Sequence, residues 1–78
     1  MLKIKDNVDL KELEKYGFKK TKFNSYIIDF GSNHYESNFI NISTKDRVID
    51  VVTAYFGHKE ISILYDLIKD GLVEKVDD

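Results

Sequence analysis

The sequence predicts a small α+β protein, a two-layer sandwich in which a mainly antiparallel sheet carries two helices on one face. The chain has 78 residues, so we expect a single domain covering 1–78. Short segments with strand-like alternation surround two amphipathic segments with helical spacing. The turns between the central segments are short, which is typical of an antiparallel meander. One sheet face can cover the apolar stripes of both helices.

The N-terminal elements are predicted to be a strand and a short, capped helix. Leu2 and Ile4 alternate with lysines, the period of a half-buried strand. Asp9 predicts the N-cap of the helix, because its carboxylate can accept hydrogen bonds from the free amides of the first turn. Glu12, three residues later, is placed to complete a capping box. Gly17 predicts the helix end, since glycine readily adopts the left-handed conformation found there.

Four further strands are predicted in the middle of the chain, separated by polar turns. The first carries three lysines, which typically protect an edge strand from aggregation. The last is rich in β-branched residues. Their expected ranges are 18–23, 26–30, 35–43 and 47–55.

A second helix and a short final strand complete the predicted order β-α-β-β-β-β-α-β. The helix begins near Gly57 and ends at Gly71, and residues 73–76 form the last strand. Its apolar residues follow the i, i+3, i+4, i+7 rule and are Ile61, Leu64, Tyr65, Ile68 and Leu72. The residues expected in the core are Leu13, Phe18, Ile49, Val51, Leu64 and Ile68.

Composition excludes several chemistries. The chain has no cysteine, which excludes disulfides, thiolate zinc sites, iron–sulfur clusters and cysteine nucleophiles. A small domain that folds without disulfides fits a reducing compartment, so we expect a cytoplasmic protein. No apolar run has the length of a signal peptide or a membrane span, so no membrane is expected among its partners.

Charge is unevenly distributed along the chain. Residues 1–22 carry seven lysines against four acidic residues, whereas residues 46–78 carry four basic residues against eight acidic ones. The net charge is −2. A basic front and an acidic back can steer charged partners, and solvated surfaces of mixed sign are the simpler interpretation.

No sequence motif for catalysis or cofactor binding is present. The four glycines are isolated, so there is no phosphate loop and no dinucleotide fingerprint. Two His-x-Glu triplets begin at His34 and His58, and a metal site drawing on both is the weaker alternative to surface and capping roles. We therefore expect a non-enzymatic protein with no catalytic residue, no cofactor and no metal.

The leading functional hypothesis is a small protein-binding module. A sheet with helices on one face leaves the other face open, and contiguous exposed apolar area on a small domain usually marks an interface. One arrangement exposes Ile27, Phe39 and Tyr55 there, although the sequence leaves open which face is helix-free. The expected partner is an unidentified protein, with self-association as a second option.

The rival hypothesis is binding of single-stranded nucleic acid by the strand and turn at 19–26. Lysines would follow the phosphates and aromatic rings would stack on the bases. Three lysines neutralise few phosphates and the chain is acidic, so this hypothesis ranks second. The candidate contacts are Lys19, Lys20, Lys22, Phe23 and Tyr26.

Two stretches of the chain resemble a known group of proteins. They are the helix with its caps at 9–18 and the helix end with its following strand at 64–76. Together they resemble small uncharacterised proteins carried by phages and prophages of low-GC Gram-positive bacteria, and the Lys-, Ile- and Asn-rich composition suits such an origin. The matching residues are helix caps and core positions, so the resemblance implies a phage association and assigns no functional residue.

Overall fold

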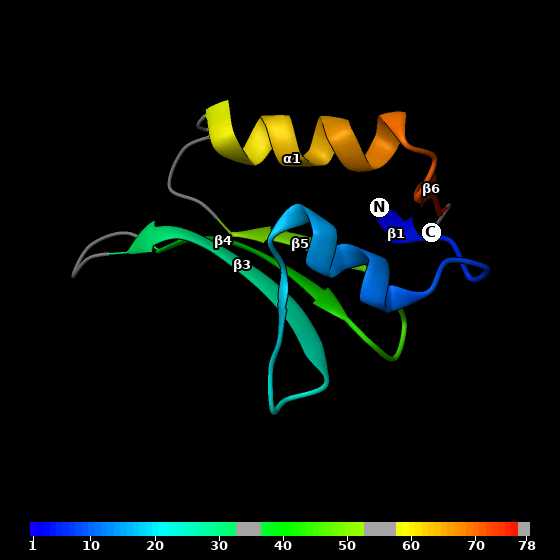
Figure 1. The fold of residues 1–78 in the computed structure, drawn as a ribbon, viewed down its shortest axis with the longest axis horizontal. Coiled ribbons are helices and arrows are strands. Elements are labelled where there is room, and N and C mark those ends of the chain that lie inside the picture. Colours follow the sequence, from blue (N-terminus) through cyan, green and yellow to red (C-terminus); the bar gives the residue numbers. More distant parts are fainter. Residues whose placement is uncertain (33–36, 53–57, 77–78) are drawn as a thin grey trace.

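The computed structural model describes residues 1–32, 37–52 and 58–76, and in it the chain is a small α+β protein with two antiparallel sheets and two helices (Figure 1). The first helix, η1, is a 3₁₀-helix and the second, α1, is an α-helix. In chain order the elements are β1 (Leu2–Ile4), η1 (Leu10–Tyr16), β2 (Lys19–Lys20), β3 (Ser25–Ser32), β4 (Ser37–Ser43), β5 (Ile49–Val52), α1 (His58–Lys69) and β6 (Val73–Lys75).

The strands form two sheets where the sequence analysis expected one. Strands β2, β3, β4 and β5 lie side by side in that order, and β1 pairs separately with β6. A bridge between Lys3 and Val48 connects the two sheets. The strand expected over 47–55 begins only at Ile49, because Arg47 has a left-handed backbone with φ of 64°.

The register of the four-stranded sheet assigns its two faces. Residues that pair across an antiparallel ladder project to the same side. Tyr26 pairs with Ile42, which pairs with Ile49, and all three side chains are buried. Leu13 of η1 and Leu67 of α1 belong to the same buried cluster as these residues. The buried cluster comprises Ile4, Leu13, Phe18, Tyr26, Ile40, Ile42, Ile49 and Leu67.

Helix η1 has the predicted caps at both ends. The Asp9 carboxylate accepts a hydrogen bond from the Lys11 backbone amide at 3.0 Å. Gly17 ends the helix with φ of 100°, and a Cβ there would lie 3.1 Å from the Ile28 side chain. Glu12 does not complete the capping box as expected, because its carboxylate pairs with Lys15 at 2.7 Å. The helix has 3₁₀ geometry over 7 residues, a longer run than most 3₁₀-helices have.

Helix α1 ends as predicted but presents a different face to the core. Gly71 has φ of 80°, and the Leu72 amide donates back to the Leu67 carbonyl at 3.0 Å, as in a Schellman motif. Leu67 is fully buried, whereas Ile68 is exposed. The prediction that Ile68 belongs to the core is therefore wrong, because the buried side of the helix is rotated toward Leu67.

The remaining core predictions divide into two groups. Leu13, Phe18 and Ile49 are buried, which confirms them. Val51 and Leu64 are only half-buried and pack against the cluster from outside, so the prediction that they are buried is wrong.

Candidate functional site

An apolar stripe on α1 is the most extensive exposed apolar feature of a single element. Its members are Ile61, Tyr65 and Ile68, which we call the α1 stripe. Their exposed fractions are 51%, 62% and 51%. They follow an i, i+4, i+7 spacing, which places them on one side of the helix. Three of the six large apolar side chains that are exposed in the described residues thus lie together on α1.

Among residues 61–69, the borders of the α1 stripe carry one charge, that of Lys69. At about 100° per residue, Ser62 and Lys69 border it on one side and the half-buried Leu64 borders it on the other. Asp66 lies further round the helix, toward the polar surface. An exposed apolar strip with a mostly neutral border can pack against another apolar surface without placing a charge in the interface.

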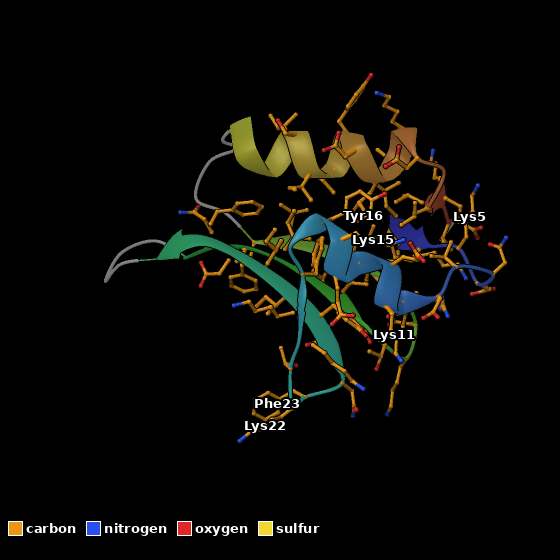
Figure 2. The ribbon with its side chains drawn as sticks, viewed as in Figure 1. Lys5, Lys11, Lys15, Tyr16, Lys22 and Phe23 are labelled. Atoms are coloured by element: carbon orange, nitrogen blue, oxygen red, sulfur yellow. The ribbon has the colours of Figure 1, made fainter. Side chains whose placement is uncertain are left out.

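A second exposed feature is the turn between β2 and β3, which we call the hairpin tip (residues 21–25). Phe23 is 86% exposed, and Figure 2 shows Phe23 and Lys22 projecting together from the end of the hairpin. Phe23 was expected to end a strand, but it lies in the turn, and Asn24 has a left-handed φ of 58°. Asparagine tolerates this conformation better than most residues.

Hydrogen bonds hold the hairpin tip in one conformation. The Thr21 hydroxyl accepts from the Phe23 amide at 3.1 Å and lies 2.8 Å from the Ser25 hydroxyl. The Asn24 carbonyl accepts both from the amide and from the hydroxyl of Thr44, each at 2.9 Å. The ring of Phe23 is therefore presented to solvent by a fixed backbone.

The structure separates the residues that were expected to contact nucleic acid. Tyr26 is buried in the core, so its ring is not accessible for stacking on a base. Lys19 pairs with Ile27 and Lys20 pairs with Tyr26, which places the two lysines on opposite faces of the sheet. Lys22 and Phe23 remain neighbours at the hairpin tip. The surface thus offers one ring and a dispersed set of lysines.

The face of the sheet opposite the core carries a smaller apolar group. Phe39 pairs with Val52 on one side and with Asp29 on the other, and Ile27 is its diagonal neighbour. Val52 is exposed, whereas Ile27 and Phe39 are half-buried. The expectation for Tyr55 lies outside the described residues.

Titratable groups in the described residues form structural links. The Tyr16 hydroxyl donates to the Asp70 carboxylate at 2.6 Å, and this hydrogen bond is the main reason that the pKa of Tyr16 is raised to about 12. The hydrogen bond from Lys15 to Glu12, with the attraction between their charges, raises the pKa of Lys15. No three histidine or acidic side chains of the described residues are grouped as a metal site would need. The triplet at His34 lies outside the described residues.

Sequence reasoning missed two features. Arg47 donates from Nη1 to the Lys5 carbonyl at 2.8 Å and to the Val8 carbonyl at 2.7 Å, which ties the segment before η1 to the start of β5. No sequence pattern indicates that contact. The α1 stripe did leave a signal, because the apolar residues of this helix are too numerous for one buried face.

The comparisons with known proteins add no relative. No protein-family model, curated protein or solved structure matches the chain. Within the described residues, no helix has the length and apolar character needed to cross a membrane.

Proposed function

We propose that the chain is a non-enzymatic protein-binding module and that the α1 stripe is its binding surface. The observation that carries the proposal is the exposure of Ile61, Tyr65 and Ile68 on one side of one helix. Helices that present apolar residues at i, i+4 and i+7 are a recurrent means of protein recognition. Tyrosine at the centre of the stripe supports the proposal, because tyrosine is enriched among residues that dominate binding energy.

The exposed apolar area of the α1 stripe provides free energy for binding a partner. Fully burying an isoleucine side chain stabilises by about 1.5–3 kcal/mol, and about half of this remains unrealised at Ile61 and Ile68 in the isolated chain. The half-exposed ring of Tyr65 adds a rigid surface that loses little entropy when it is bound. A partner that covers the stripe recovers this free energy.

The proposal includes the two-layer arrangement, with η1 and α1 on the core face of the four-stranded sheet. The shared cluster that contains Leu13, Leu67 and Tyr26 supports it, and Figure 1 draws α1 above that sheet and η1 across it. In this arrangement the α1 stripe points away from the sheet. The face that carries Phe39 is then free of helices and is a smaller second surface.

The test is affinity capture with matched variants. Wild-type chain, an Ile61→Ser/Ile68→Ser variant and a Phe23→Ser variant are immobilised, and proteins retained from a lysate of the host cells are quantified by mass spectrometry. We expect at least one protein that wild type and Phe23→Ser retain and that the stripe variant loses by about tenfold or more. Retention of the same proteins by all three chains would contradict the proposal.

The second candidate function is binding of single-stranded nucleic acid at the hairpin tip. The observation that favours it is the 86% exposed ring of Phe23 beside Lys22, on a turn held by backbone hydrogen bonds. Stacking on one ring is worth about 1–3 kcal/mol per base, and lysine contacts weaken steeply with salt. The burial of Tyr26 leaves this candidate with a single ring, so it ranks below protein binding.

Titration of a fluorescent single-stranded oligonucleotide at low and moderate salt tests this candidate. We expect affinity weaker than about 1 μM at moderate salt, because one stacked base contributes little. Tighter binding that Lys22→Glu abolishes and Phe23→Ala weakens would place nucleic acid first. Binding that disappears with added salt, and whose affinity Phe23→Ala leaves unchanged, would be non-specific attraction to lysines.

A cytoplasmic location and a phage or prophage association remain part of the proposal. The first is supported by the cysteine-free sequence and the second by the resemblance of residues 9–18 and 64–76. Fluorescent tagging at the C-terminus and transcript mapping of the neighbouring genes test the two separately.

A further inference from the structure

We draw no further inference here: the strongest candidate, the exposed apolar side of α1 at Ile61, Tyr65 and Ile68, belongs to the site already described, and nothing among the described residues shows what covers it.

Discussion

The two helices each contribute one fully buried leucine to the same core, yet they differ in how much apolar surface they leave exposed. In η1, Leu13 is buried, and Leu10 and Tyr16 are half-buried against the cluster. In α1, Leu67 is buried, while the three residues of the α1 stripe point to solvent. The difference shows that a helical pattern locates a helix without determining how much of its apolar surface the fold covers.

The width of the apolar arc explains this difference. At about 100° per residue, the apolar residues of α1 span about 200° of the helix circumference. The core covers the part of the arc around Leu67, and the α1 stripe lies beyond it. A helix packed against one surface buries a narrower arc than this. The surplus is the basis of the proposed interface.

The largest expected effect contrasts two neighbouring residues of α1. Leu67→Ala should lower the free energy of unfolding by about 2–5 kcal/mol, because it removes a fully buried side chain and leaves a cavity. Ile68→Ala should cost less than about 1 kcal/mol, since half of that side chain is already exposed. Urea denaturation measures both. Equal costs would show that the two helix faces are assigned wrongly.

The second effect tests how the chain is anchored before η1. Arg47→Ala should cost about 1–3 kcal/mol, because it removes two charge-assisted hydrogen bonds to backbone carbonyls in a half-buried setting. Lys45→Ala, in the same turn but exposed, is the control and should cost almost nothing. Arg47→Gly should cost less than Arg47→Ala, because glycine adopts the left-handed backbone of 64° without strain. Equal stability of wild type and Arg47→Ala would contradict this anchoring role.

Local signals predicted much of the fold. The Asp9 cap and the Gly17 and Gly71 helix ends depend on neighbouring residues alone, and the structure has all three. Alternation along 26–30 identified Tyr26 as one of a set of same-face residues, and that set lies on the core face. These features could be predicted because each results from interactions within a few residues.

Long-range features could not be predicted. The separate pairing of β1 with β6 brings together residues more than 70 positions apart, such as Leu2 and Lys75. The anchoring by Arg47 depends on where the segment before η1 lies in three dimensions. For the candidate site, the sequence found the exposed Phe23 and Lys22, but it also included the buried Tyr26 and assigned Ile68 of the α1 stripe to the core. Which apolar side of α1 is buried depends on where the sheet lies, and the sequence alone does not show this.

The smallest expected effect concerns the hydrogen bond that joins the ends of the two helices. The Tyr16 hydroxyl of η1 donates to Asp70, just after α1. Because the pair is near the surface and solvent screens it, Tyr16→Phe should cost less than about 1 kcal/mol at neutral pH. Urea denaturation of wild type and Tyr16→Phe in parallel gives this difference.

The pH dependence of the stability difference between wild type and Tyr16→Phe tests whether the hydrogen bond to Asp70 causes that difference. The pKa of Tyr16 is raised from its ordinary value of 10 to about 12, so the folded chain holds this proton more tightly than the unfolded chain does. The stabilisation is therefore complete below pH 10 and is lost as the pH rises toward 12. Wild type should be more stable than Tyr16→Phe by a constant amount at pH 7–9, and the two should converge above pH 10. Phenolate absorbance can be titrated against pH for both chains. The titration curve of wild type minus that of Tyr16→Phe should show one group titrating near pH 12. A difference that persists unchanged at high pH would mean that packing of the hydroxyl, and not its bond to Asp70, links η1 to α1.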